Sequence, residues 1–191
     1  MKQKKVLSYL ISIVVAVVAI YLLEPMINEA KEENKYDFTV TSLDGELKKD
    51  DFKGKALAIY FGYIYCPDVC PTSLSSLAQA LKQFDDEKLK NFKGLFISVD
   101  PKRDTLPVLK EYAQYFHPTF LGATSNKENI DNITQRYGSY YKMVQLENSA
   151  MGYSVSHTSY IYIFDKEGKL VKKVDHFAHP EQIKEVLEQV L

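Results

Sequence analysis

The sequence has no excess of charge of either sign. It holds 24 Lys and Arg residues against 25 Asp and Glu residues, for a formal net charge of −1, and in residues 36–191 the basic side chains are interleaved with acidic ones. Because attraction to phosphate needs clustered Lys and Arg, nucleic-acid binding has little support. Internal repeats and low-complexity tracts are also lacking. With 46% apolar and 26% charged residues, the composition is that of an ordinary globular protein.

Cysteine is scarce as well, since the chain has only Cys66 and Cys70. Neither lies near the apolar run at the N-terminus, which excludes a bacterial lipoprotein anchor there. A structural zinc site needs four ligands that the chain does not visibly supply. A disulfide between two cysteines this close in sequence would remove little chain entropy from the unfolded state, so it would stabilise the fold only weakly. A purely structural role for the pair is therefore disfavoured.

An uncharged apolar stretch occupies residues 6–23. Its length is at the short end of the roughly 17–25 residues that cross a bilayer as a helix. Lys2, Lys4 and Lys5 precede it, so this end is expected to stay cytoplasmic, and no small-residue cleavage site follows it. We predict a cytoplasmic N-terminus at residues 1–5, an uncleaved transmembrane signal anchor at 6–23, a polar linker at 24–35, and a translocated, extracytoplasmic domain at 36–191.

Short apolar runs alternate with helical patterns in the main domain. The runs suit buried strands and lie at residues 56–63, 94–99 and 160–164. Residues 169–175 are a plausible antiparallel partner for the third run, and residues 37–41 are a weaker strand candidate. Apolar residues at helical spacing occur at 72–84, 105–116, 127–137 and 180–190. This order predicts a three-layer α/β domain, with which a thioredoxin-like arrangement is compatible.

Cys66 and Cys70 lie where a predicted central strand ends and a helix begins. Ligands and reactive groups collect at such strand ends in open α/β sheets. A helix N-terminus favours thiolate over thiol, and Pro71 suits the first helical position. Three residues separate the cysteines, one more than in the C-x-x-C of ordinary disulfide oxidoreductases, which gives two thiolates room to reach one ion. The pair is therefore either a redox-active dithiol or a soft-metal site, for which thiolates select Cu(I) or zinc.

A third metal ligand would come from the four histidines. His157 shortly precedes the predicted strand at 160–164, and in a thioredoxin-like fold the loop entering that strand faces the cysteine loop. His117 is expected to be a helix cap or surface residue, and His176 and His179, just before the last helix, are disfavoured as ligands. Imidazole binds Cu(II) well, so two cysteines and one histidine could hold copper as Cu(I) and as Cu(II).

Two motifs resemble the Sco/SenC family. They are Phe61-Gly62-Tyr63 leading into C-P-D-V-C-P at residues 66–71, and S-V-D-P-K-R-D-T at residues 98–105. The late His157 fits the same family, and the match spans residues 36–190. The resemblance implies a thioredoxin-like fold with a central mixed sheet, and copper bound by Cys66, Cys70 and His157. It also implies a role in assembling the dinuclear copper centre of cytochrome c oxidase, with the copper-binding subunit of the oxidase or another copper chaperone as partner.

Some residues around these motifs have two interpretations or depart from the family pattern. Asp68 is either a weak carboxylate contact to Cu(II) or a residue that complements the helix dipole. Ser156 stands where the family usually has an Asp able to orient the imidazole, and Tyr65 stands where many members have His. Arg103 is expected to pair with a carboxylate and to fix its loop rather than to bind metal.

Two functions share this site. The first is a copper metallochaperone, a binding and assembly protein without turnover. The second is a thiol–disulfide oxidoreductase that reduces the cysteines of the copper-receiving subunit or acts in redox homeostasis, with one of Cys66 and Cys70 attacking a disulfide and the other resolving it. Dithiol exchange does not require an imidazole from a second segment, whereas Cu(II) binding does. His157 therefore favours copper delivery, with thiol–disulfide chemistry as the alternative.

Overall fold

In the computed structural model, the described residues are 13, 15, 17–24, 35–147, 149 and 151–191. They belong to two compact units, Met1–Lys35 and Tyr36–Leu191. In the first unit, residues 17–24 are helical and their side chains are exposed. Among the described residues, no helix is both long and apolar enough to span a membrane. Residues 6–12, 14 and 16 of the predicted anchor, and residues 25–34 of the predicted linker, lie outside the described part of the chain.

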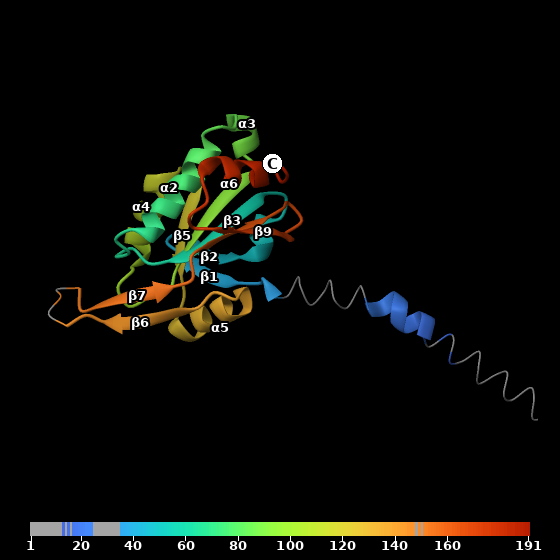
Figure 1. The fold of residues 1–191 in the computed structure, drawn as a ribbon, viewed down its shortest axis with the longest axis horizontal. Coiled ribbons are helices and arrows are strands. Elements are labelled where there is room, and N and C mark those ends of the chain that lie inside the picture. Colours follow the sequence, from blue (N-terminus) through green and yellow to red (C-terminus); the bar gives the residue numbers. More distant parts are fainter. Residues whose placement is uncertain (1–12, 14, 16, 25–34, 148, 150) are drawn as a thin grey trace, which may run out of the picture. The chain divides into compact units, whose positions relative to one another are not determined.

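A seven-stranded sheet forms the centre of the second unit (Figure 1). Its strands are β1 (Thr39–Ser42), β2 (Gly45–Lys48), β3 (Ala56–Gly62), β4 (Phe92–Ser98), β5 (Phe120–Thr124), β8 (Tyr160–Phe164) and β9 (Leu170–Asp175), in the order β2-β1-β5-β4-β3-β8-β9. β3 pairs with β4 in parallel and with β8 antiparallel, so the sheet is mixed. Every residue of β3 is buried, as its continuous apolar sequence predicts for a central strand.

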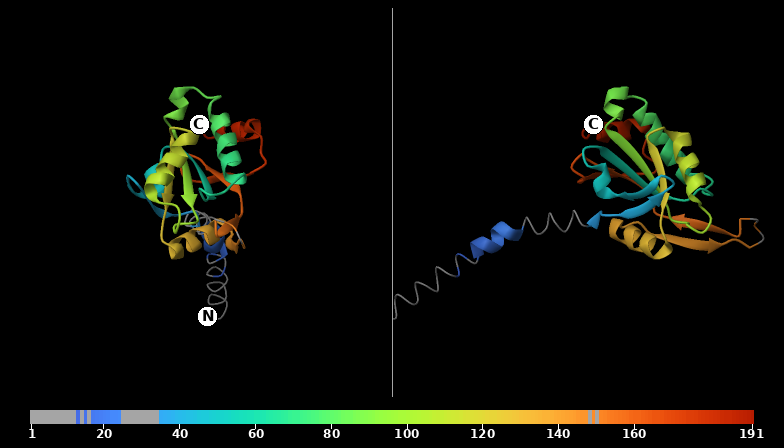
Figure 2. Two further views of the ribbon diagram at one scale, coloured as in Figure 1. Left: turned by 90° about the vertical axis from the view of Figure 1, so that its left-hand side faces the viewer. Right: turned by 180° about the vertical axis from the view of Figure 1, so that it is seen from behind.

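Helices cover both faces of this sheet (Figures 1 and 2). They are α2 (Val69–Leu81), α3 (Asp86–Leu89), α4 (Leu106–Phe116), α5 (Lys127–Tyr137) and α6 (Pro180–Leu187), with a short 3-10 turn, η1, at Lys49–Phe52. α2, α4 and α6 lie on one face, and α5 lies on the other. There the ring of Tyr137 packs edge-on against Phe61 and Tyr162 of the sheet, with ring centroids 5.1 Å and 5.3 Å away. The predicted three-layer α/β arrangement is confirmed.

Most of the predicted elements are present with small shifts at their ends. The helix 127–137 and the strand 160–164 have the predicted bounds, and β9 is the antiparallel partner of β8. The correction that matters most for the site concerns α2, which runs over Val69–Leu81 rather than over the predicted residues 72–84. Pro71 is therefore the third helical residue, and it is tolerated there because the first four N–H groups of a helix have no intrahelical partner. The earlier start brings Cys70 into the first turn.

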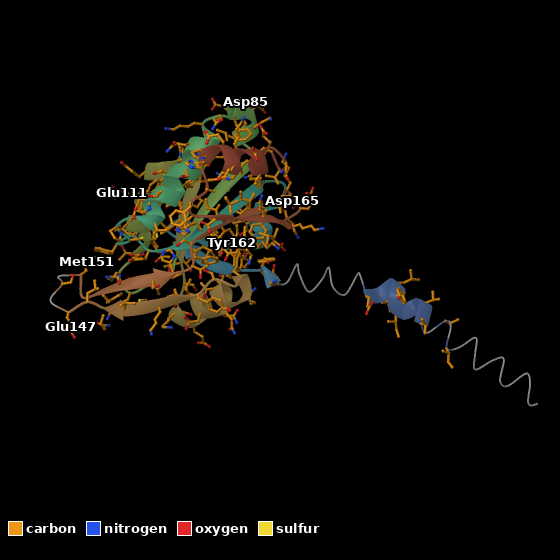
Figure 3. All side chains as sticks on the ribbon, in the orientation of Figure 1. Asp85, Glu111, Glu147, Met151, Tyr162 and Asp165 are labelled. Carbon is orange, nitrogen blue, oxygen red and sulfur yellow. The ribbon has the colours of Figure 1, made fainter. Side chains whose placement is uncertain are left out.

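The sequence patterns missed two strands of the main sheet and a separate two-stranded sheet. The strands are β2 and β5, and the second sheet is a hairpin of β6 (Tyr141–Gln145) and β7 (Tyr153–His157). Glu147 and Met151 lie at its turn, at the far end from the main sheet (Figure 3). The hydroxyl of Tyr141 on β6 donates to Asp131 of α5. His157, predicted to lie in a loop, is the last residue of β7.

Candidate metal centre

The two cysteines lie at the junction between β3 and α2. Cys66 is in the connecting loop and partly buried, whereas Cys70 is in the first turn of α2 and fully buried. The N–H of Cys70 donates to Cys66 Sγ at 3.4 Å, so the sulfur of Cys66 accepts one of the unpaired donors of the helix N-terminus. Both cysteines are free thiols. The strand-to-helix junction predicted for the pair is confirmed.

Gly62, the last residue of β3, leaves space for the sulfur of Cys70. A Cβ atom at this position would lie 2.8 Å from Cys70 Sγ, 2.9 Å from Phe96 Cε2 and 3.0 Å from Tyr60 Cε1. All three neighbours are buried, so none could move aside cheaply. Gly62 is thus a site residue by virtue of having no side chain. In the sequence, Gly62 stands out only as part of the motif Phe61-Gly62-Tyr63.

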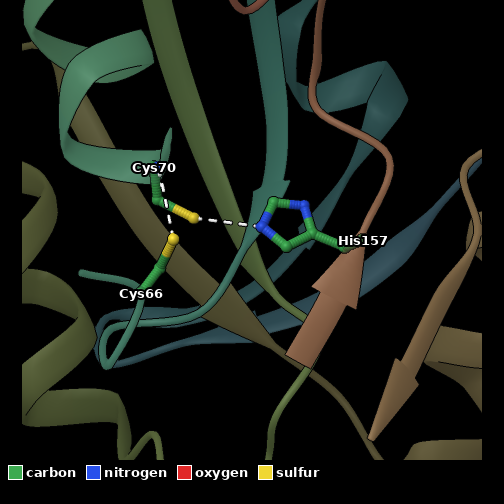
Figure 4. A group of neighbouring side chains, drawn as sticks. All are labelled: Cys66, Cys70 and His157. Atoms are coloured by element: carbon green, nitrogen blue, oxygen red, sulfur yellow. Dashed lines mark hydrogen bonds between the residues drawn. The ribbon is translucent and has the colours of Figure 1, made fainter. Parts of the chain in front are cut away.

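His157 faces the cysteines from the end of β7 (Figure 4). Its Nε2 is 3.2 Å from Cys70 Sγ, and its Nδ1 is 3.2 Å from the backbone carbonyl oxygen of Thr158. Because a carbonyl only accepts, Nδ1 carries the proton in this arrangement, which leaves the Nε2 lone pair directed at the thiols. The rings of Tyr60 and Tyr63 contact the imidazole edge-on, with centroids 6.2 Å and 5.9 Å away.

One ligand atom from each of Cys66, Cys70 and His157 can be chosen so that all lie within 4.8 Å of one another. The two segments that supply them are 87 residues apart in sequence, between Cys70 and His157. Two sulfurs and one imidazole nitrogen form a soft donor set of the kind that binds Cu(I), and the imidazole also suits Cu(II). The structure therefore brings together the three residues that the sequence analysis selected.

The two thiols differ in their acidity. Hydrogen bonding from the Cys70 thiol lowers the pKa of Cys66. The backbone N–H groups of Cys70 and Asp68 lower it further, whereas partial burial acts in the opposite direction. Burial raises the pKa of Cys70, and the neighbouring Cys66 sulfur raises it further. Cys66 is therefore the thiolate of the pair, and it is also the more accessible sulfur.

The other candidate residues lie outside this three-residue group. Asp68 is exposed, and the hydroxyl of Thr72 donates to it at 3.4 Å. His117 is the C-cap of α4, as predicted, but it is buried and bonded to Thr119 rather than on the surface. His176 Nδ1 lies 3.2 Å from Asp175 Oδ1, and His179 is the N-cap of α6. Ser156 is exposed on β7, so the imidazole is oriented by the Thr158 carbonyl instead of a preceding carboxylate.

The loop after β4 supports the cysteine loop without contributing a ligand. Arg103 Nε lies 2.5 Å from Asp100 Oδ2, which confirms the predicted ion pair. Asp104 is buried, and its Oδ2 accepts the backbone N–H of Ile64 at 3.0 Å and the hydroxyl of Ser98 at 2.6 Å. The bond to Ile64 fixes the chain two residues before Cys66. Sequence reasoning missed this tie because a short spacing such as D-x-x-x-D does not reveal a partner 40 residues away.

The fold and this thiol-and-imidazole site define a protein of the thioredoxin-like class. The thioredoxin domain of a thiol-disulfide oxidoreductase from Bacteroides vulgatus superposes with a TM-score of 0.56 at 20% identity, over 81% of this chain and 94% of that one. Identity this low shows the fold alone. The predicted thioredoxin-like α/β fold with a central mixed sheet is thus confirmed.

The family follows from closer matches. A family model described as SCO1/SenC matches residues 27–191. A SCO2-like protein of Rickettsia felis is 35% identical over 191 residues, covering 93% of this chain and 91% of that protein. The copper-bound crystal structure of Arabidopsis thaliana ScoI superposes with a TM-score of 0.73 at 31% identity, over 81% of this chain and 96% of that one. The chain belongs to the SCO1/SenC family.

Proposed function

We propose that this protein binds one copper ion through Cys66 Sγ, Cys70 Sγ and His157 Nε2. The observation that carries the proposal is the convergence of these three ligand atoms from two distant segments within 4.8 Å. The copper bound by Arabidopsis thaliana ScoI supports the choice of metal. The soft thiolates favour Cu(I), and the imidazole extends the site to Cu(II). The proposed ligand set leaves out Asp68, whose carboxylate is exposed.

Copper is the cargo of this site rather than a resident catalyst. Cys66 and His157 are partly buried, so the bound ion would remain accessible to a receiving protein, while Cys70 is enclosed by the core. We propose that the recipient is the dinuclear copper centre of cytochrome c oxidase, reached through its copper-binding subunit or another copper chaperone. Membership of the SCO1/SenC family supports this role.

A copper titration tests the proposal. The purified full chain should bind one equivalent of Cu(II) with thiolate-to-copper charge-transfer absorption, and His157→Ala should lower the Cu(II) affinity by more than about a hundredfold, because losing even an outer partner of a ligand costs about 10–100-fold. His179→Ala is the matched control, since His179 is exposed and outside the three-residue group. If His157→Ala binds Cu(II) as tightly as the wild type, the three-ligand site is wrong.

Thiol–disulfide exchange is the second candidate function. The opposite shifts in the pKa values of Cys66 and Cys70 favour it. The Cys66 thiolate would attack one sulfur of a target disulfide, forming a mixed disulfide and releasing one target thiolate. Cys70 would then attack Cys66, releasing the second target thiolate and leaving a Cys66–Cys70 disulfide. Two electrons pass to the target, and an external dithiol reductant must restore the pair. The measurement that decides is the reduction potential of the pair: if it is more oxidising than the target disulfide, this function is excluded.

We further propose that residues 6–23 anchor the chain in a membrane with residues 36–191 on the extracytoplasmic side. The support is the uncharged stretch between the Lys-rich N-terminus and the polar segment 24–35. Protease added outside intact cells or vesicles of known orientation should digest residues 36–191 and leave the N-terminus protected. Release of the intact domain by a salt wash, without detergent, would contradict an anchor.

A further inference from the structure

The histidine of the site is carried by an element that does not belong to the main sheet. β6 and β7 pair only with each other within the described strands, so no ladder of backbone hydrogen bonds fixes the position of His157 relative to the cysteines. The short connection from His157 to Tyr160 of β8 and the side-chain contacts of the hairpin do so instead. On the β6 side, one such contact is the bond from Tyr141 to Asp131 of α5.

On the β7 side, the hairpin is tied to the loop after β4 by Arg103. Its Nη1 donates to the backbone carbonyl oxygens of Tyr153, at 2.9 Å, and Met151, at 3.2 Å. Its Nε donates to Asp100 Oδ2, while the hydroxyl of Tyr153 donates to Asp100 Oδ1 at 2.9 Å. The guanidinium carbon also lies 3.7 Å from the centre of the Tyr153 ring. Arg103, Asp100 and Tyr153 thus form a closed set of contacts at the start of β7.

The same arginine lies against the cysteine loop. Its guanidinium carbon is 5.1 Å from the ring centre of Tyr65, the residue before Cys66, and 5.8 Å from that of Tyr63. The adjacent Asp104 accepts the N–H of Ile64 in the same loop. Arg103 therefore touches both segments that supply the metal ligands, and its side chain is only 16% exposed.

We propose that Arg103 is a positioning residue that holds the β6–β7 hairpin against the cysteine loop and so sets the place of His157 in the site. The inference rests on the proposed copper function. A guanidinium suits this task because its planar fork donates to a carboxylate and to carbonyls at once and stacks on aromatic rings, which a lysine ammonium cannot do. Arg103→Lys keeps the charge and removes the fork. It should therefore weaken the contribution of His157 while leaving the cysteines as they are.

A double-mutant cycle on the purified full chain tests this, with Cu(II) and Cu(I) salts as the probes. Arg103→Lys should lower Cu(II) affinity about tenfold or more and reduce the nitrogen hyperfine signal of the imidazole, as loss of an outer partner typically does. Cu(I) affinity should change less than about threefold, since the two thiolates are the ligands that select Cu(I). In the His157→Ala background, Arg103→Lys should cause no further loss of Cu(II) affinity, because its effect passes through His157.

A second readout needs no copper. Hydrogen exchange of the β6–β7 amides should become about tenfold faster in Arg103→Lys, because hydrogen bonds to a charged group resist local opening, while the β3 and β4 amides stay protected. Arg136→Lys is the matched control, since the side chain of Arg136 bonds to Asn132 on the exposed surface of α5. If Arg103→Lys disrupts the whole fold, Tyr153→Phe removes one contact of the set and serves in its place.

The outcomes separate the two proposals. If the wild type binds no Cu(II), or if His157→Ala binds it normally, the proposed function fails. If the wild type and His157→Ala behave as expected but Arg103→Lys leaves both Cu(II) affinity and hairpin exchange unchanged, this inference alone is wrong. Equal losses of Cu(II) affinity in the wild-type and His157→Ala backgrounds would also overturn it, because Arg103 would then act on the cysteines or on the fold in general.

Discussion

The two sides of the candidate metal centre are built in different ways. The cysteine side rests on β3, a central strand in which all seven residues are buried, and on the first turn of α2. The histidine side rests on β7, in which only Val155 is fully buried. Among the strands that the structure describes, β7 pairs only with β6. One half of the site is part of the core. The other is a peripheral hairpin that is held by side-chain contacts and by its short connection to β8.

This difference has a consequence for the stability of each half. Local opening of an element costs less free energy where fewer buried contacts must be broken. We therefore expect His157 to leave the site more readily than Cys70. A protein that must both hold and release a metal ion can use such an arrangement, because loss of one ligand weakens binding without unfolding the domain. Three experiments test this comparison of the two sides of the site. Two concern the cysteine side and one concerns the histidine side.

The largest effect is expected where the cysteine side meets the core, at Gly62. Gly62→Ala would place a Cβ against Cys70 Sγ and two buried rings, and such overpacking typically destabilises a fold by about 1–3 kcal/mol. Because the sulfur of Cys70 must move, affinity for Cu(I) and Cu(II) should both fall, by about a hundredfold. Urea unfolding and copper titration of the full chain measure the two effects.

Gly94→Ala is the control for this change. A Cβ at Gly94 would meet the ring of Phe120, in a part of the sheet where Gly94 pairs with Ala58 and Phe120 and not with site residues. It should lower the free energy of unfolding at least as much as Gly62→Ala while leaving the copper affinity of the folded protein unchanged. Equal losses of copper affinity in both variants would mean that general destabilisation, and not the place of the Cys70 sulfur, is responsible.

A smaller effect is expected in the pH dependence of cysteine alkylation. A thiol whose pKa is lowered remains a thiolate at every pH above that lowered value, so Cys66 should react with iodoacetamide almost as fast at pH 6 as at pH 8. An ordinary thiol, with a pKa of about 8.5, would react much more slowly at pH 6. Allowing for the lower nucleophilicity of an acidic thiol, Cys66 should exceed Cys70 about tenfold at pH 6.

The chain unfolded in urea provides the control for this measurement, because both cysteines are then ordinary thiols. Mass spectrometry of the alkylated peptides assigns the rates to Cys66 and Cys70 separately. If the rate at Cys66 in the folded protein climbs with pH as steeply as it does in the unfolded chain, then the acidity assigned to Cys66 is wrong. Thiol–disulfide exchange would then also lack the Cys66 thiolate that it needs as the attacking group.

The smallest effect is expected on the histidine side, for Tyr153→Phe. This change removes only the hydroxyl that donates to Asp100, a bond worth about 0.5–1.5 kcal/mol, and it keeps the ring under Arg103. Cu(II) affinity should fall about threefold, with Cu(I) affinity unchanged. Tyr140→Phe is the matched control, because Tyr140 lies just before β6 and is 71% exposed. An equal fall in Cu(II) affinity in both variants would show that the bond from Tyr153 to Asp100 does not help to hold His157 in the site.

The accuracy of the sequence-based predictions follows this division between core and periphery only in part, because β5 is a buried strand of the main sheet that the sequence patterns also missed. β3, β4 and β8 were recognised because buried strands are continuous apolar runs, and α4, α5 and α6 because their apolar residues recur at helical spacing. The hairpin was missed because β6 and β7 are partly exposed and mix Lys, Gln, Ser and Tyr with few apolar residues. The glycine at position 152 was the sequence signal that could have indicated the turn of the hairpin, and in the structure Gly152 has a φ of +68°.

The sequence by itself determined which residues are the candidate metal ligands, and where in the fold two of them lie. Cys66 and Cys70 follow a strand that could only be central, and the junction of a buried strand with a helix places both at one end of the sheet. Local patterns suffice for such features, because they depend on neighbours in the chain.

Only the tertiary structure decided how the site is completed. It placed His157 Nε2 at 3.2 Å from Cys70 Sγ, left the sulfur of Cys70 in the space that a Cβ on Gly62 would take, and joined Arg103 to both halves. These contacts link segments up to 87 residues apart. They depend on the path of the hairpin and on packing between side chains, and neither is encoded in the spacing of residues along the chain.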